Sequence, residues 1–236
     1  MGPVSNAWRS TIIADEALWS SDMLFDMTGS CIELKECLRS DAVLFNAYAR
    51  LPALYDSTDQ ASIIQSYRAQ FPVQEPCVHN LCISHEMRIR INRKENMRLA
   101  PPDAQYIMVQ GKQASRCAQQ SLLWPGLQLL GCVGRPRKGV RNSVLYTIQY
   151  CEEEVKLVEL PATFSYEEIK EFMRLGHCRT YASVQGTEFD ESLRLHETGH
   201  ARFTLRHLFV GLSRAKSKDL VQIAYGGLSK WLISGR

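Results

Sequence analysis

A stretch of polar residues at positions 180–188 is suited to contacts with phosphates and sugars. It offers hydroxyl and amide groups, and Gly186 allows a tight turn or a close approach of the backbone to a ligand. Further along the chain, an apolar run ends in Ser213-Arg214. An arginine at that place is permanently charged and can bind a polyphosphate through two parallel hydrogen bonds. The two segments together predict a phosphate-binding site. The polar side chains of the first segment are Thr180, Ser183, Gln185 and Thr187.

These groups need a framework that brings distant segments together, and the apolar patterning predicts one. Short apolar runs predict buried strands, and longer patterned runs that open on Asp or Ser predict helices. The predicted strands cover 31–34, 80–84, 179–183, 192–195 and 220–224. The predicted helices cover 15–27, 41–51, 59–71, 86–98, 166–175, 203–212 and 228–233. Strands that alternate with helices are typical of an α/β fold with a parallel sheet.

The character of the chain changes at Pro101-Pro102. After it, helices are scarce and Gly and Pro break short β-rich runs, which predicts a small inserted β module. The predicted strands of this module cover 106–109, 127–132, 144–150 and 155–160. We therefore expect an N-terminal extension at 1–30, an α/β domain made of 31–100 and 161–236, and a β-rich module at 101–160.

The composition is that of a soluble globular protein. The chain has 236 residues, of which 45% are hydrophobic and 22% charged, and this excludes collagen-like and wholly disordered chains. No apolar run approaches the ~18 residues of a membrane span, and no signal peptide is visible at the start. The eight cysteines have no repeating spacing, so we expect free thiols in a reducing compartment. The expected location is intracellular, either cytoplasmic or nuclear, with no membrane partner.

One segment matches the zinc-peptidase pattern H-E-x-x-H, at His196 to His200. In such an enzyme both histidines lie one helical turn apart on the same helix. Gly199 disfavours a helix here, so we expect a loop. Asp219 is the nearby downstream candidate for a third ligand. A zinc peptidase therefore stays as a remote alternative.

Two other segments imitate metal sites. The span 77–85 holds two cysteines and two histidines, but its middle is a predicted strand that would point Cys82 and His85 to opposite faces. Asp15-Glu16 follows an apolar pair in the way that a magnesium-binding acidic pair follows a strand, although a helix start is the simpler interpretation. We expect no resident metal at either segment.

The segments 180–189 and 209–215 together resemble motifs V and VI of superfamily 1 helicases. That family carries T-x-H-x-x-Q-G in motif V and Y-V-A-L-(S/T)-R-A in motif VI. The matching strings here are TYASVQG from Thr180 and FVGLSRA from Phe209, with Ala182 in place of the histidine of motif V. The order and spacing of the two strings, and the apolar strand that follows, make the joint resemblance more specific than either string alone.

The resemblance extends upstream. The segment 34–41, with Arg39 after a short strand, resembles motif IV, and 80–92 resembles the strand and helix that open the second RecA-like fold. The segment 126–148 resembles the β insertion of many members. A phosphate loop G-x-x-x-x-G-K-(S/T) is absent from the sequence. The family has that loop on its first RecA-like domain, so we expect this chain alone to lack ATPase activity.

The resemblance implies the second RecA-like domain of an ATP-dependent DNA helicase. This domain is a parallel sheet flanked by helices, and the inserted module is like a small β-barrel. ATP and Mg²⁺ would bind only with a first motor domain, which a separate chain could carry. By resemblance, Arg39 and Arg214 contact the γ-phosphate. Gln185, Gly186 and Glu188 lie near the nucleotide, and Glu188 is a candidate for a ribose hydroxyl.

Single-stranded or duplex DNA is the partner that the resemblance implies. Thr180 would contact the phosphates of a single strand, and Arg88 could line a groove that follows the backbone. Arg135 and Arg141 belong to a basic cluster whose sequence predicts a hairpin tip that could touch DNA. The net charge of +3 does not by itself indicate nucleic acid. The alternative function is non-enzymatic: a nucleic-acid-binding or partner-binding remnant that uses the β module and its basic tip.

Overall fold

The computed structural model describes residues 39–74, 76–107, 120–184 and 186–225. The helices predicted at 15–27 and 228–233, the strand predicted at 31–34 and the Asp15-Glu16 pair lie outside these ranges. Gln185, one of the predicted nucleotide contacts, also lies outside the described residues.

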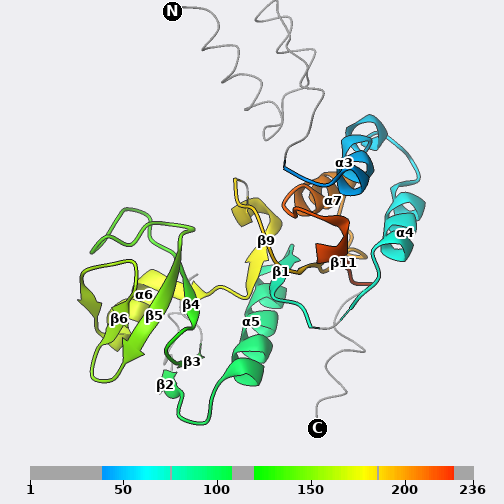
Figure 1. Cartoon of the computed structure of the whole chain (residues 1–236). Coiled ribbons are helices and arrows are strands. Elements are labelled where there is room, and N and C mark those ends of the chain that lie inside the picture. Colours follow the sequence, from blue (N-terminus) through cyan, green and yellow to red (C-terminus); the bar gives the residue numbers. More distant parts are fainter. Residues whose placement is uncertain (1–38, 75, 108–119, 185, 226–236) are drawn as a thin grey trace, which may run out of the picture.

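A parallel four-stranded sheet forms the centre of the α/β part (Figure 1). Its order is β11 (Val221–Ile223), β10 (Leu193–Leu195), β1 (His79–Cys82) and β9 (Cys178–Thr180). The register pairs Leu81 with Leu195 and with Arg179, and all three pairings of the sheet are parallel. The strands predicted at 80–84, 179–183, 192–195 and 220–224 are all present, although shorter than predicted, and their parallel arrangement is confirmed. Because parallel strands end at the same edge of a sheet, the segments that follow these strands lie together.

Helices cover both faces of this sheet. On one face α5 (His85–Leu99) packs Met87 and Ile91 against Cys82 and Cys178. On the other face α3 (Ala42–Ala49), α4 (Gln60–Gln70) and α7 (Leu205–Leu212) form the larger core with Leu81, Leu193 and Leu195. This division follows from the alternation of side chains along each strand, since Leu81 and Cys82 point to opposite faces.

The helices α3, α4 and α5 begin within one residue of their predicted starts, because polar side chains cap them. Asp41 accepts a hydrogen bond from the backbone N of Leu44 at 2.8 Å, and Ser84 accepts one from Met87 N at 3.1 Å. Such caps satisfy backbone N–H groups that have no partner inside the helix. Asp59 caps α4 in the same way. Within the ranges that the structure describes, we find no helix with the length and apolar character required to cross a bilayer.

A second, antiparallel sheet lies between α5 and β9 in the chain, and it curls around its own core (Figure 1). Its order is β7 (Thr163–Phe164), β6 (Val155–Leu157), β5 (Leu145–Cys151), β4 (Gln128–Gly131) and β8 (Met173–Leu175). A two-stranded sheet of β2 (Gln105–Ile107) and β3 (Ser121–Leu123) lies before it in sequence. The predicted change to β structure after Pro101-Pro102 is confirmed.

The helix predicted at 166–175 is too long. The helix α6 covers Tyr166–Phe172, and the next three residues form β8, which pairs with β4. Met173 adopts an extended backbone, and Met173 and Leu175 are buried while Arg174 between them is half-buried. That alternation has the period of a strand. Pairing with β4 therefore stabilises these three residues more than an extension of the helix would. The antiparallel sheet therefore includes residues beyond position 160.

Candidate functional site

Three segments that are far apart in sequence meet beside the parallel sheet. They are 39–41, 186–191 and 213–218, which contain the predicted Arg39, Glu188 and Arg214. Phe189 N donates to Arg214 O at 2.8 Å, and this pairing continues as a parallel β-bridge between Phe189 and Ala215. Two further bonds tie in the first segment, Ser40 Oγ to Ala215 O at 3.2 Å and Asp41 N to Lys216 O at 2.9 Å. Backbone bonds thus hold the three segments as one unit.

Arg39 and Glu188 are in direct contact. Arg39 Nε lies 2.9 Å from Glu188 Oε1, and Arg39 Nη2 donates to the backbone oxygen of Thr187 at 3.5 Å. The two side chains are 32% and 49% exposed, so both can be reached from solvent. Two residues that the sequence analysis assigned to separate contacts therefore form an ion pair with each other.

Arg214 follows the end of α7. The helix stops at Ser213, and Arg214 N bonds to Gly211 O in a tighter turn. The residue is 4% exposed, and its Nη2 donates to Ser213 Oγ at 3.2 Å. The sequence analysis expected an arginine that reaches across an interface, whereas here the guanidinium is packed inside the molecule. Its backbone nevertheless lies against Phe189, one residue from Glu188.

Gly186 has the conformation that the sequence predicted. Its φ is +75°, in the left-handed region that glycine adopts without strain. Nothing lies within 4 Å of the position where a side chain would begin, so the backbone alone explains the glycine. Thr187 N then bonds to Val184 O at 3.0 Å and closes a turn. This turn directs the chain from the end of β9 towards Glu188.

Thr180 ends β9 and opens the turn that leads to Gly186. Its backbone oxygen accepts from Ser183 Oγ at 2.9 Å, and a short 3-10 helix, η2 (Tyr181–Val184), follows. The strand predicted at 179–183 is therefore shorter than expected. Thr180 is half-buried at the carboxyl end of the sheet, which is where ligands of α/β folds bind.

Arg179 is a polar residue of this region that the sequence analysis did not single out. It is 3% exposed, and its Nη2 donates to Ser183 O at 2.9 Å and to Thr187 Oγ1 at 3.4 Å. Burial, together with the charge of Arg174, lowers the pKa of Arg179 to about 10. An arginine inside a predicted buried strand was the signal that could have identified it.

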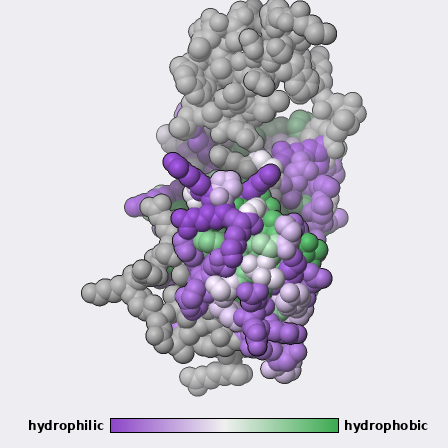
Figure 2. All heavy atoms as spheres, turned by 90° about the vertical axis from the view of Figure 1, so that its left-hand side faces the viewer, coloured by the Kyte–Doolittle hydropathy of each residue, from purple (hydrophilic) through white to green (hydrophobic). Residues whose placement is uncertain are grey.

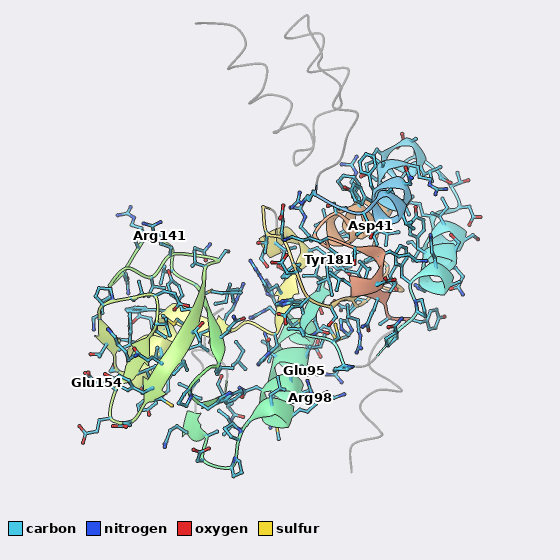
Figure 3. All side chains as sticks on the ribbon, in the orientation of Figure 1. Asp41, Glu95, Arg98, Arg141, Glu154 and Tyr181 are labelled. Carbon is cyan, nitrogen blue, oxygen red and sulfur yellow. The ribbon has the colours of Figure 1, made fainter. Side chains whose placement is uncertain are left out.

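The predicted DNA contacts lie in different surroundings. Arg88 was expected to line a groove, but it is 2% exposed, because it belongs to the face of α5 that packs on the sheet. Burial, and secondarily the charge of Arg174, lowers the pKa of Arg88. Arg135 and Arg141 are exposed, and they flank a turn that the β-bridge between Arg137 and Val140 closes. The predicted hairpin tip is confirmed, and Figure 3 shows Arg141 pointing away from the module.

The tip carries less free charge than its sequence suggests. Arg137 Nη1 lies 2.5 Å from Glu171 Oε1, and Lys138 Nζ lies 2.6 Å from Glu168 Oε1. Both acids belong to α6. These ion pairs anchor the tip on α6 and leave the exposed Arg135 and Arg141 as its outward charges.

The H-E-x-x-H segment forms the loop that the sequence predicted, and its residues have other partners. Glu197 has a positive φ of 58° and is buried, and its carboxylate accepts bonds from Ile83 N, Ser84 N and Ser84 Oγ at 2.7–2.8 Å. His196 Nε2 lies 2.8 Å from Asn80 Oδ1, whereas His200 is exposed. No helix aligns the two histidines, so the zinc-peptidase alternative does not fit this chain.

The cysteine and histidine cluster at 77–85 is likewise used for packing. Cys77 Sγ donates to His79 O at 3.1 Å, and Cys82 Sγ lies 3.5 Å from Cys178 Sγ in the core under α5. Across the described part of the chain, no three His, Cys, Asp or Glu side chains gather closely enough to hold a metal ion.

Asn92 and Asn96 of α5 position the strands next to the site, and the sequence analysis missed their role. Asn92 accepts from Cys178 N at 2.7 Å and donates to Cys178 O at 3.1 Å, as a neighbouring strand would. Asn96 bonds to both backbone groups of Leu122 at 2.7 and 2.8 Å. One helix thereby holds β9 of the parallel sheet and β3 of the β-rich part in place.

No protein-family model and no curated protein matches this sequence. Solved structures do match. A structure of two Pif1 helicases that coordinate DNA unwinding at forked double-stranded DNA has 18% identity and a TM-score of 0.58 over 81% of this chain and 49% of that one. Bacteroides Pif1 bound to single-stranded DNA has 17% identity and a TM-score of 0.55 over 81% and 51%.

A third structure, the Bacteroides Pif1 helicase with ADP-AlF3 and single-stranded DNA, has 16% identity and a TM-score of 0.53 over 81% of this chain and 51% of that one. At these identities the likeness concerns the fold. The chain spans about half the length of the helicases it matches. Its fold is therefore similar to that of about half of each of these helicases.

Proposed function

We propose that this chain acts as the second RecA-like domain of a superfamily 1 DNA helicase and that residues 101–160 belong to a module inserted into that domain. The complete enzyme would couple ATP hydrolysis to movement along single-stranded DNA. The observation that carries the proposal is the meeting of segments 39–41, 186–191 and 213–218. They overlap the segments 34–41, 180–189 and 209–215, which resemble motifs IV, V and VI, and they are joined by backbone hydrogen bonds.

The neighbouring structures support the same function. Those helicases are bound to single-stranded or forked DNA, and one of them holds ADP-AlF3 as well. In the proposed complex, the phosphates of ATP and their Mg²⁺ are held by a first RecA-like domain that docks on these three segments. That domain belongs to the same or a separate chain. ATP bound there supplies the phosphoryl group, and the residues of this chain supply positive charge for its transfer.

Each site residue has a proposed role in that complex. Arg39 exchanges Glu188 for the γ-phosphate, and Arg214 leaves Ser213 Oγ to reach the same group. Glu188, released from Arg39, accepts a hydrogen bond from a ribose hydroxyl. Gln185 and Gly186 lie near the nucleotide, and Thr180 contacts the phosphates of the DNA strand. Arginines that stabilise charge on a transferred phosphoryl group contribute roughly 10³-fold or more to its rate.

A chimera tests this proposal. The second half of Bacteroides Pif1 is replaced by this chain, and ATP hydrolysis is measured with and without single-stranded DNA. We expect hydrolysis that DNA stimulates and that falls by roughly 10³-fold in the Arg214→Met variant, because the guanidinium is lost from the transition state. Arg50→Met, which removes an exposed arginine after α3, serves as the control and keeps the rate. A folded chimera that binds ATP and DNA but hydrolyses ATP equally well with Met at position 214 contradicts the assigned role.

The second candidate function is non-enzymatic binding of nucleic acid through the hairpin tip. It is favoured by the exposure of Arg135 and Arg141. Figure 2 shows that hydrophilic residues cover much of the described surface on one side of the molecule. We expect single strands to bind with a strong salt dependence. We also expect this binding to weaken when Arg135, Arg137 and Arg141 are replaced by Ala. Fluorescence anisotropy of a labelled oligonucleotide at several salt concentrations measures this. Binding that ignores salt, or that is unchanged in the triple variant, speaks against the tip.

A further inference from the structure

Tyr225 projects from the surface of the α/β part. It is 77% exposed, the highest value among the exposed large hydrophobic side chains that the structure describes. It follows β11 by two residues, at the edge of the parallel sheet where the strands have their carboxyl ends. Exposure alone does not make a site, because single apolar side chains are common on protein surfaces. What distinguishes Tyr225 is the way in which the fold holds its ring.

The ring of Tyr225 lies against a fixed guanidinium. The central carbon of the Arg68 guanidinium is 4.6 Å from the ring centroid, which is the geometry of a cation–π contact. Arg68 Nε donates to Thr198 Oγ1 at 2.9 Å, and Arg68 Nη1 donates to Gln65 Oε1 at 2.9 Å. Thr198 Oγ1 in turn donates to Ala224 O at 2.7 Å, on the residue before the tyrosine. Three segments, α4, the loop after β10 and the residues after β11, therefore hold the ring and the guanidinium together.

One face of the ring is open to solvent. Arg68 lies over one face, and a ring covered on both faces could not be 77% exposed. Among the described residues, no other aromatic ring stacks on Tyr225 and no carboxylate forms an ion pair with Arg68. A flat π-system with a negative charge attached to it fits this surface, because it can stack on the open face while Arg68 attracts the charge. A nucleotide base with its phosphate has both features.

The same edge of the sheet carries Thr180, which the proposed function places on a DNA strand. Hydrogen bonds connect the carboxyl ends of the strands along this edge. Tyr181 Oη, after β9, donates to His196 O, after β10, at 3.1 Å, and Ala224 N donates to the last residue of β10 at 2.9 Å. Three strand spacings separate β9 from β11, which places their ends about 14 Å apart. A single strand of a few nucleotides can therefore contact both Thr180 and Tyr225.

We propose that Tyr225, held in place by Arg68, is a stacking platform for a base of single-stranded DNA. The strand itself comes from the proposed function, on which this inference rests. Stacking on an aromatic ring tolerates any sequence, because every base has a π-face. Such a contact suits a protein that moves along DNA without reading its sequence. The platform lies at the β11 end of the sheet, so it adds a DNA contact that is separate from Thr180 and from the hairpin tip.

The experiment measures binding of the whole chain to two labelled probes by fluorescence anisotropy at several salt concentrations. One probe is an oligothymidylate, and the other is an abasic oligomer of the same length, which has the phosphates but no bases. Tyr225→Ala removes the ring, and Tyr225→Phe keeps it. Tyr150→Ala is the matched control, because Tyr150 is a tyrosine of β5 that is 40% exposed on the antiparallel sheet.

We expect Tyr225→Ala to bind the oligothymidylate roughly tenfold more weakly than the wild type does, because one stacked base is lost. Its affinity for the abasic oligomer should equal that of the wild type. The slope of log K against log salt should be unchanged in Tyr225→Ala, since the loss of a ring removes no phosphate contact. Tyr225→Phe and Tyr150→Ala should bind both probes as the wild type does.

The outcomes separate this inference from the proposed function. Equal affinity of the wild type and Tyr225→Ala for the oligothymidylate overturns the inference, even where the ring binds another partner such as a peptide, and leaves the proposed function standing. A loss of affinity that is equally large with the abasic oligomer also overturns it, since the ring would then act without a base. If neither probe binds the wild type at low salt, the inference fails and the proposed function loses its DNA partner.

Discussion

Arg39 and Glu188 form an ion pair between two segments that are distant in the sequence. Both side chains are partly exposed, and surface ion pairs contribute at most about 1 kcal/mol to stability. The pair is therefore easily exchanged for a stronger partner. A phosphate is such a partner, because it can carry more than one negative charge and can accept two parallel hydrogen bonds from the guanidinium. The resting geometry is thus compatible with the role proposed for Arg39.

His196 makes stability depend on pH. Burial, and the charges of Arg194 and Lys94, lower its pKa to about 3, whereas the unfolded chain has a histidine pKa of about 6.5. The folded state therefore holds the imidazole neutral and the unfolded state takes up a proton first as the pH falls. The neutral imidazole of His196 therefore contributes fully to the free energy of unfolding above about pH 6.5. As the pH falls towards 3, this contribution decreases by about 1.4 kcal/mol per pH unit.

Urea unfolding at pH 7, 6 and 5 measures this dependence. In His196→Gln we expect stability to fall less between pH 7 and pH 5, because glutamine does not titrate and can still donate to Asn80 Oδ1. His200→Gln, at an exposed histidine, is the control and should keep the wild-type slope. Equal slopes in His196→Gln and the wild type would rule out the buried imidazole as the cause.

The packing of α7 on β10 decides where Arg214 lies, and it depends on Gly211. A side chain at position 211 would begin 2.6 and 2.7 Å from the two methyl carbons of Leu195, which is fully buried. The resembling helicase motif has alanine at this place, so the close approach of helix and strand explains the departure. The helix can therefore lie nearer to β10 than an alanine would allow.

Gly211→Ala tests this contact. Alanine favours a helix by about 1 kcal/mol over glycine, but overpacking of a core costs about 1–3 kcal/mol. We expect a net loss of stability in the wild-type background, and a smaller loss or a gain when Leu195 is also replaced by Ala, since the methyl groups are then gone. Chemical unfolding of the four proteins of this double-mutant cycle gives the coupling energy. Gly134→Ala, where nothing lies within 4 Å, is the matched control; an additive cycle would contradict the explanation.

At the scale of the whole molecule, the proposed function assigns to the parallel sheet one side of a nucleotide site. The sequence has no G-x-x-x-x-G-K-(S/T) loop to hold the phosphates of ATP. Because transfer of a phosphoryl group needs that loop and Mg²⁺ opposite the arginines, we expect the purified chain to hydrolyse no ATP, with or without single-stranded DNA. Release of phosphate in a coupled assay measures this. Robust turnover stimulated by DNA would contradict the prediction and would draw attention to Asp15 and Glu16.

The elements around the site were predictable because their signals are local. Asp41, Asp59 and Ser84 each bond to a backbone N–H three residues later, so a helix start is written in a few neighbouring positions. The glycine turn at Gly186 and the hairpin tip at 135–141 depend in the same way on adjacent residues. The end of the helix expected at 166–175 was wrong for the opposite reason, since residues 173–175 form a strand only because β4 lies beside them.

The sequence by itself determined the alternation of strands and helices, the caps and turns, and the order of the segments that resemble helicase motifs. The tertiary structure decided which of the charged residues meet. Arg39 faces Glu188, Arg214 is packed inward, and Arg88 is buried on the face of α5 that packs on the sheet. Local patterns depend on residues a few positions apart, whereas the burial and partners of a long charged side chain depend on which distant strands pair beside it.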